Sequence, residues 1–319
     1  MQTIHAAGGR VPRARRLRDS LAFYGFVSPW LLGTVLLTLF PVGYAFYLSF
    51  TNWNGLTPYM PWAGLANYRE VLTSGDTLQS LERTLLLVAV VVPSTVLGSL
   101  VLAVLLDKRV RGRIVLRTLI YLPAVVPPVA AALIWKTVFD KDSGDANRLL
   151  SVFGVGPVSW LEGNASFVVL IIVLLWGAGT GIIINLAALQ TVPAEQVEAA
   201  RMDGAGALAT FRHVTLPAIS PVLLFQTVLV TITTLQTFVP AILLSPIGDS
   251  DVVTNIPNAN RVYMVNVYEQ FFAYSRYGYG SAMLVVFFAV ILAITVVVFR
   301  VLGRSVFYAV DPTESRARG

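Results

Sequence analysis

The sequence contains no cysteine and only two histidines, His5 and His213. Without cysteine there is neither a disulfide framework nor a thiolate metal site, and the histidines have no companion ligands at metal spacing. A phosphate-binding loop is also missing, because the only Lys followed by Ser or Thr is Lys136, and Trp135 rather than Gly precedes it. Neither a nucleophile elbow nor an HExxH motif occurs. We therefore expect no catalytic, cofactor-binding or metal-binding residue in this chain.

Charge is also scarce: 13% of the residues are charged, against about a quarter in soluble domains, and the mean hydropathy is +0.72. Six apolar runs reach the roughly 20 residues that a bilayer-spanning helix needs. The basic stretch before the first run resembles a signal peptide, but the run is too long and no cleavage site follows it. We predict an all-α, polytopic membrane protein with six transmembrane helices. They lie near 23–49, 84–106, 116–139, 166–190, 218–245 and 282–307.

The distribution of positive charge predicts the orientation. Most of the 23 Lys and Arg residues lie before the first span, in the 107–117 connection, in the 191–217 loop and after the last span. Since such residues collect on the cytoplasmic side, both termini are expected in the cytoplasm. The chain is expected to cross the plasma (inner) membrane several times. The net charge of +6 follows from this topology and does not indicate nucleic-acid binding. We expect a basic arm at 1–20, one membrane domain at 21–310 and a tail at 311–319.

Helix breakers interrupt several spans. Pro41, Pro93 and the cluster Pro123, Pro127 and Pro128 are expected to bend or break their helices. The fourth span carries Trp176-Gly177-Ala178-Gly179-Thr180-Gly181. Gly177 and Gly181 have the spacing of close helix contact, but the same glycines are consistent with a bend where a substrate reaches the backbone.

The fifth span carries an unusual number of polar side chains. Wound as a helix from Phe225 to Pro240, it has one apolar stripe and one polar arc. The stripe is Val228, Ile232, Leu235 and Val239; the arc is Gln226, Thr233, Gln236 and Thr237, with Thr227, Thr231 and Thr234 beside it. Such side chains either join helices or line a wet cavity for a neutral polyhydroxylated ligand. Asn185 and Gln190 are candidates to extend the arc from the fourth span.

Ionisable residues are almost missing from the spans. Lys136 lies near the outer end of its helix and Arg300 near the inner end of the sixth. Ion-driven carriers keep such groups near the bilayer middle. The energy for any transport is therefore expected from outside the bilayer, and if that energy is ATP, another chain must hydrolyse it.

The 191–217 loop has a defined internal pattern. Pro193 is typical of a helix start, and Asp203-Gly204 predicts a helix end. A second short helix is expected to run to Leu216-Pro217. The loop is either a connector that lies on the lipid headgroups or a surface that a cytoplasmic partner binds.

The full motif is Glu198-Ala199-Ala200, Gly204 and Val214-Thr215-Leu216-Pro217. It resembles the EAA loop of ABC-importer permeases, with Val in place of Ile. Residues from about 20 to 310 resemble the sugar-permease branch similar to the MalF subunit. The supporting segments are SFTNWNGL (49–56), GLANYREVL (64–72), RTLIYLPAVVPPVAAALIW (117–135), LQTVPAEQVEAARMDGA (189–205) and YGYGSAM (277–283).

This resemblance implies a type I ABC importer permease fold and a set of site residues. Glu198 would pair with a basic residue of the ATPase subunit, and Gly204 would form the elbow. The implied docking set is Glu198, Ala199, Ala200, Asp203, Gly204, Leu216 and Pro217. Sugar contacts in the family fall on Gly177, Thr233, Thr234 and Thr237, which overlap the polar arc with its Gln226 and Gln236. The sequence departs from many relatives after Ser245, where a long insert replaces a Gly-Gly-Pro turn.

The resemblance also implies the partners. They are a second homologous permease, two copies of an ATPase subunit that bind ATP and Mg, an extracytoplasmic solute-binding protein, a sugar substrate and membrane lipid. Another solute, such as an osmolyte or glycerol phosphate, remains an alternative. So do an ion-coupled secondary carrier and a membrane receptor or scaffold. The aromatic residues of the external loops fit either an interfacial belt or a docking surface.

Overall fold

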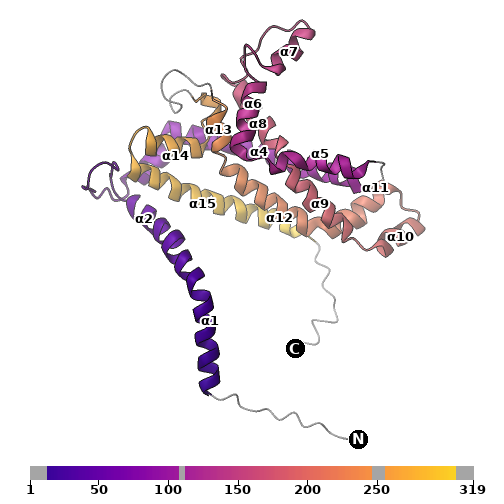
Figure 1. Ribbon diagram of the computed structural model, residues 1–319, viewed down its shortest axis with the longest axis horizontal. Coiled ribbons are helices and arrows are strands. Elements are labelled where there is room, and N and C mark those ends of the chain that lie inside the picture. The colour runs from indigo at the N-terminus through magenta and orange to yellow at the C-terminus, as the bar shows by residue number, and fades with distance from the viewer. Residues whose placement is uncertain (1–12, 108–111, 246–255, 307–319) are drawn as a thin grey trace.

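The computed structural model describes residues 13–107, 112–245 and 256–306. These residues form helices and connecting turns, with a single isolated bridge between Thr51 and Trp62 in the described part. Five helices there are long and apolar enough to cross a membrane, and a bent pair makes up to six. The all-α prediction is confirmed. The helices of the main bundle lie side by side, and the first helix stands away from them (Figure 1).

The first span consists of α1 (Arg13–Thr34), a π-helical turn η1 (Val35–Leu39) and α2 (Phe40–Leu48). The helix thus begins inside the stretch expected as an arm, and residues 1–12 lie outside the described residues. In the π turn the Phe40 N–H donates to Val35 O. Pro41 follows at once and lacks an N–H of its own, so the wider turn accommodates it without ending the helix. Only 6% of the apolar 18-residue stretch of this span is buried within the chain.

The second span is one long helix, α4 (Gly75–Asp107), and the short helix α3 (Ala66–Thr73) precedes it. It starts nine residues before the predicted span and continues without a break through Pro93. Its contacts with α9 and α12 are among the most extensive in the bundle. Leu87 and Val91 pack in one apolar core with Val169, Leu170 and Ala241.

The third span differs from the single helix expected at 116–139. It consists of α5 (Arg113–Val125) and α6 (Pro128–Val138), bent by 101°. Val126 and Pro127 both have extended backbone, with ψ angles of 126° and 139°. Each of them precedes a proline, which disfavours the helical conformation. The expected break at this cluster is confirmed.

The remaining elements form the fourth to sixth spans and their connections. A small helix, α7 (Asp145–Val152), projects from the bundle beyond α6 (Figure 1). The elements are α8 (Ala165–Trp176), α9 (Gly179–Gln190), α10 (Ala194–Met202), α11 (Ala207–Thr210), η2 (Phe211–Thr215), α12 (Leu216–Leu235), α13 (Val239–Leu243), η3 (Asn258–Asn260), α14 (Tyr263–Phe272), α15 (Tyr277–Leu302) and η4 (Gly303–Ser305).

Candidate functional site

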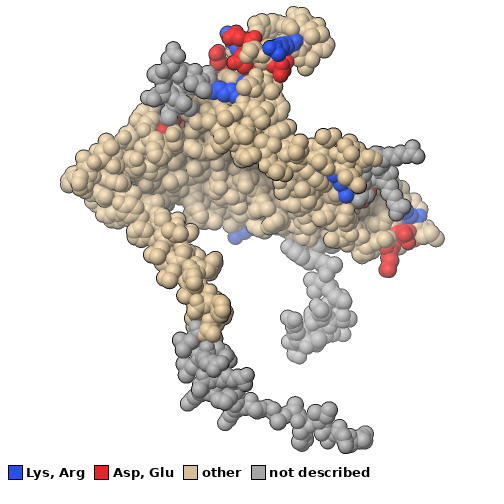
Figure 2. All heavy atoms as spheres, viewed as in Figure 1, with Lys and Arg blue, Asp and Glu red and all other residues tan. Residues whose placement is uncertain are grey.

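The connection between the fourth and fifth spans forms a projection at one end of the bundle (Figure 1). Its helix α10 has no buried residue, and both Glu198 and Ala199 are exposed. Met202 and Leu208 are 87% and 80% exposed. The space-filling view shows acidic side chains gathered at this end (Figure 2). The projection therefore combines small, apolar and acidic side chains on a surface that the rest of the chain leaves uncovered.

Gly204 ends α10 in the manner predicted from the sequence. Its φ angle is +84°, a left-handed conformation that side chains with a Cβ rarely adopt. The Gly204 N–H donates to Arg201 O and the Ala205 N–H to Ala200 O, both at 3.0 Å. This pair of bonds is the Schellman motif, which satisfies carbonyls that a helix end leaves free. Asp203, exposed, is the last residue before the turn.

The second short helix expected in this loop is not a separate element. α11, η2 and α12 form one continuous helix, Ala207–Leu235. The Leu216 N–H donates to Phe211 O through the π turn, and Pro217 follows in the first turn of α12. As at Pro41, the π turn absorbs the missing N–H of proline. Leu216 and Pro217 are half-buried at the base of the fifth span, apart from the exposed residues of the projection.

A cavity of about 400 Å³ lies between the second, fourth and fifth spans. Five of the six residues predicted for a substrate pathway line it: Gly177, Gln226, Thr233, Thr234 and Thr237. The sixth, Gln236, lines a second cavity of about 660 Å³, which also includes Thr233 and Thr237. None of the described residues that line either cavity carries a charge. Thr95 of α4 is a lining residue that the sequence reasoning missed.

The helix through this region ends earlier than the predicted winding to Pro240. α12 ends at Leu235, and the chain turns before α13. The Thr237 N–H donates to Thr234 O at 3.1 Å, which closes the turn. In a continued helix the ring of Pro240 would collide with the carbonyl of Gln236. The break leaves Gln236 exposed and Thr237 buried, so the two do not share the regular arc expected for them.

Three spans meet at Ser99 of α4. Its hydroxyl accepts bonds from Asn185 Nδ2 at 2.9 Å and Gln226 Nε2 at 2.8 Å. It donates to Val96 O at 3.0 Å. All three side chains are buried. We call Ser99, Asn185 and Gln226 the three-helix joint, because their hydrogen bonds connect three helices of the bundle. The sequence signal of this joint is one of three hydroxyl side chains, Ser94, Thr95 and Ser99, in the second half of α4, and the sequence alone does not show which of them meets other spans.

Of the two glycines with the spacing of close helix contact, Gly181 makes that contact with other spans and Gly177 does not. A Cβ on Gly181 would overlap Gln226 Nε2, and one on Gly179 would lie 2.9 Å from Ile120 O. Gly177, by contrast, has only backbone atoms near such a Cβ, at 3.7 and 3.9 Å. It lies in the break between α8 and α9, beside the 400 Å³ cavity. Gly179 and Gly181 thus allow close packing, and Gly177 opens to the cavity.

Comparison with known proteins agrees with this architecture. Residues 94–313 match the family model described as "Binding-protein-dependent transport system inner membrane component". The chain is 33% identical to the probable ABC transporter permease protein YesP of Bacillus subtilis, over 93% of this chain and 95% of that protein. It is 30% identical to the trehalose/maltose transport system permease protein MalF of Thermococcus litoralis, over 90% and 95% of the two chains.

A solved structure shows the same fold. It is a chain of the bacterial alginate ABC transporter in complex with an alginate pentasaccharide-bound periplasmic protein. The TM-score is 0.77 at 20% identity, over 90% of this chain and 95% of that one. The chain described here therefore belongs to the family of inner-membrane components of binding-protein-dependent transport systems and is a multi-pass permease of the inner membrane.

Proposed function

We propose that this chain is the permease subunit of an ABC importer for a sugar or related polyol. It forms half of the translocation pathway, and it couples to a separate ATPase through the EAA projection (residues 191–217). Both termini lie on the cytoplasmic side together with this projection. The chain itself performs no covalent chemistry, and ATP and Mg bind to the ATPase partner.

One observation carries the proposal: a single helix joins the two candidate sites. The helix Ala207–Leu235 leaves the exposed projection at one end and presents Gln226 and Thr233 to the cavity farther along. A displacement of the projection by a partner is thereby delivered to the cavity wall without a flexible linker. Glu198, Ala199, Ala200, Asp203 and Gly204 form the proposed contact with the ATPase. Leu216 and Pro217 connect that contact to the fifth span.

The lining of the cavities supports a neutral polyhydroxylated solute. Threonine hydroxyls and glutamine amides supply both donors and acceptors to sugar hydroxyls. The described lining residues include no lysine or arginine to pair with a phosphate. Phosphorylated polyols are therefore disfavoured on this half of the pathway. The trehalose/maltose system, to whose permease the chain is similar, agrees with a neutral carbohydrate.

The first span supports a second permease subunit. Phe26 and Leu37 are 88% and 79% exposed on a helix that stands apart from the bundle (Figure 1). Small or polar residues are the usual contacts between membrane helices, and this helix has Gly25, Gly33 and Gly43 with nothing near a Cβ. A neighbouring permease can pack against those positions, while lipid covers the large side chains.

Copurification tests the proposal most directly. The chain, extracted in mild detergent from its native membrane, is expected to bring down a second permease and an ATPase. The complex, reconstituted into liposomes, should take up a sugar at the expense of ATP only when the external binding protein is present. A solitary chain whose transport follows an ion gradient would contradict the importer and support a secondary carrier.

A further inference from the structure

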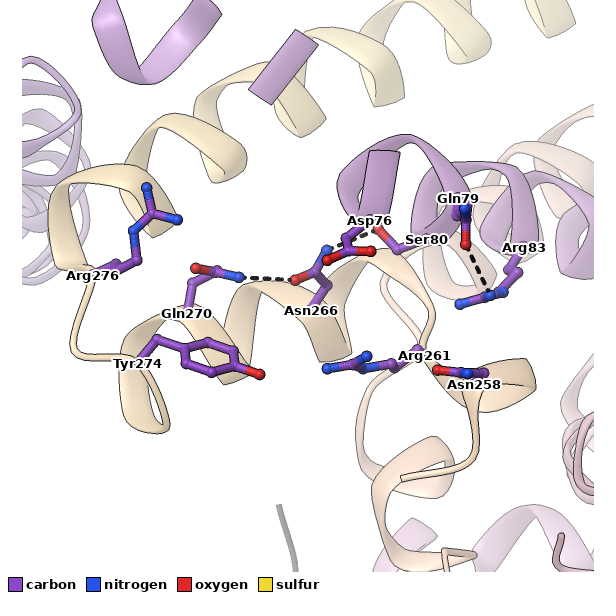
Figure 3. Close-up of a pocket in the computed structure, with 10 residues that line it drawn as sticks. All are labelled: Asp76, Gln79, Ser80, Arg83, Asn258, Arg261, Asn266, Gln270, Tyr274 and Arg276. Carbon is purple, nitrogen blue, oxygen red and sulfur yellow. Dashed lines mark hydrogen bonds between the residues drawn. The ribbon is translucent and has the colours of Figure 1, made fainter. Parts of the chain in front are cut away.

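A polar pocket of about 600 Å³ lies at the opposite end of the bundle from the EAA projection. Two helix faces form most of it. Asp76, Gln79, Ser80 and Arg83 recur at helical spacing on α4, and Asn266 and Gln270 lie one turn apart on α14 (Figure 3). With the projection in the cytoplasm, this pocket opens on the external face.

The pocket is held in shape by a network of bonds. Gln270 Nε2 donates to Asn266 Oδ1, and Asn266 Nδ2 donates to Ser80 Oγ, both at 3.2 Å (Figure 3). Arg276 bonds both carboxylate oxygens of Glu70 at 2.7 Å and lies 4.2 Å from the centre of the Tyr279 ring. Because these groups are fixed before any partner arrives, little side-chain freedom is lost on binding.

Two guanidinium groups in the pocket retain donors for a ligand. Arg261 bonds Glu269 through Nε, at 3.0 Å to each oxygen, and the Tyr274 hydroxyl also lies within hydrogen-bonding reach of the Arg261 guanidinium, whose terminal nitrogens point into the pocket (Figure 3). Arg83 has no carboxylate within ion-pair distance in the described residues and only a long bond, 3.4 Å, to Gln79. Among the described residues that line the pocket, the one acid is Asp76, which lies in the first turn of α4, where the helix N-terminus offsets its charge.

We propose that this external pocket receives a carboxylate side chain from the surface of the solute-binding protein, held between Arg83 and Arg261. Guanidinium groups bind carboxylates by paired, charge-assisted hydrogen bonds, which fixes orientation as well as charge. The inference rests on the proposed importer function and names the contact through which the external partner docks.

A bound sugar explains the pocket less well than a protein side chain does. α14 separates the pocket from the transmembrane cavities: Asn266 and Gln270 face the pocket, whereas Met264 lines the 660 Å³ cavity. A solute held in the pocket would therefore lie off the pathway. A docking contact requires no opening toward the cavities.

The test measures ATPase activity of the reconstituted importer as a function of binding-protein concentration. For Arg83→Glu we expect the half-saturating concentration to rise about tenfold, with the maximal rate unchanged, because a carboxylate partner is now repelled. Arg83→Lys keeps the charge but loses the paired bonds, and should lie between Arg83→Glu and the unaltered importer. Arg148→Glu is the matched control, since Arg148 lies on α7, away from the pocket, in an exposed pair with Asp145.

The outcomes separate this inference from the proposed function. If Arg83→Glu matches Arg148→Glu, or lowers the maximal rate with an unchanged half-saturating concentration, the docking contact is wrong. A changed sugar KM at saturating binding protein would assign the pocket to the solute and also overturn the inference. If binding protein stimulates no ATPase activity even in the unaltered importer, the proposed function itself fails.

Discussion

The EAA projection and the three-helix joint are opposites in burial. Glu198 and Ala199 on α10 are exposed, whereas Asn185 and Gln226 are 0% and 1% exposed. A side chain on the projection contributes little to the stability of this chain, so the fold does not restrict which residue stands there and a partner can. A side chain at the joint is constrained from several directions by neighbours. Substitutions on the EAA projection should weaken coupling to the ATPase in a folded protein. Substitutions at the three-helix joint should lower the stability of the fold.

The largest effect is expected at Gly181. In Gly181→Val the new side chain would overlap Gln226 Nε2 and press on Ser99, whose Cβ and Oγ both lie 3.2 Å from the Cβ position. Overpacking of this kind costs about 1–3 kcal/mol, and here it also separates the amide from the Ser99 hydroxyl. We expect a large loss of monodisperse protein after extraction and a lower unfolding temperature.

Gly177→Val is the control for that change. It lies in the same span, but no heavy atom comes within 3.7 Å of its Cβ position. Size-exclusion profiles should therefore resemble those of the unaltered chain. Equal damage from both substitutions would show that helix propensity, and not contact with Gln226, governs this span.

The next effect is expected on the projection, in Glu198→Lys. The charge is reversed on an exposed residue of α10, so the chain should fold and insert normally. If Glu198 pairs with a basic residue of the ATPase, the reversal should reduce ATP-dependent uptake by about tenfold or more. Gln196→Lys adds a lysine to another face of the same helix and should have much less effect. Normal uptake by Glu198→Lys would contradict the docking role.

A smaller effect is expected in the cavity, in Thr233→Leu. Thr233 is exposed, and within the described residues its hydroxyl bonds carbonyls of its own helix alone, at 3.0 and 3.1 Å. Its removal should leave the complex assembled and raise the KM of sugar uptake about threefold to tenfold, the value of one or two lost hydrogen bonds. Thr227→Leu makes the same change on α12 outside both cavities. If the two variants transport alike, the threonines of α12 serve the helix rather than the solute.

The sequence specified the two regions to different degrees. The first half of the EAA projection was predicted because its signals are local: the glycine at the turn and the short helix before it depend only on neighbouring residues. The break at Pro127-Pro128 was predicted for the same reason. The second short helix expected in the projection was wrong, since it continues into the fifth span. The six residues predicted for a substrate pathway were chosen from an ideal helix and a family resemblance; all six line one of the two cavities, and their contact with a solute stays a prediction. The ideal helix itself was wrong beyond Leu235.

What could not be predicted depends on contacts between distant segments. Ser99 is 86 residues from Asn185 and 127 from Gln226, and no local pattern distinguishes it from a serine that faces lipid. The external pocket has the same character, since α4 and α14 meet only in the folded chain. The π turns before Pro41 and Pro217 were missed because proline was treated as a breaker, whereas one wider turn keeps each helix continuous.

The smallest effect tests the turn that shapes the projection. A Cβ at Gly204 would meet no atom within 4 Å, so Gly204→Ala changes only the backbone preference at φ +84°. An L-residue pays about 1–2 kcal/mol for this left-handed conformation. Gly206→Ala is the matched control, because Gly206 is equally open but has a φ of −68°. We expect Gly204→Ala to lower ATP-coupled uptake severalfold with the assembled complex intact, and Gly206→Ala to leave uptake unchanged. Neither added methyl group meets another atom of the chain, so a difference in uptake between the two variants would come from the backbone geometry of the turn. Equal uptake would mean that binding of the ATPase to α10 does not depend on the angle of this turn.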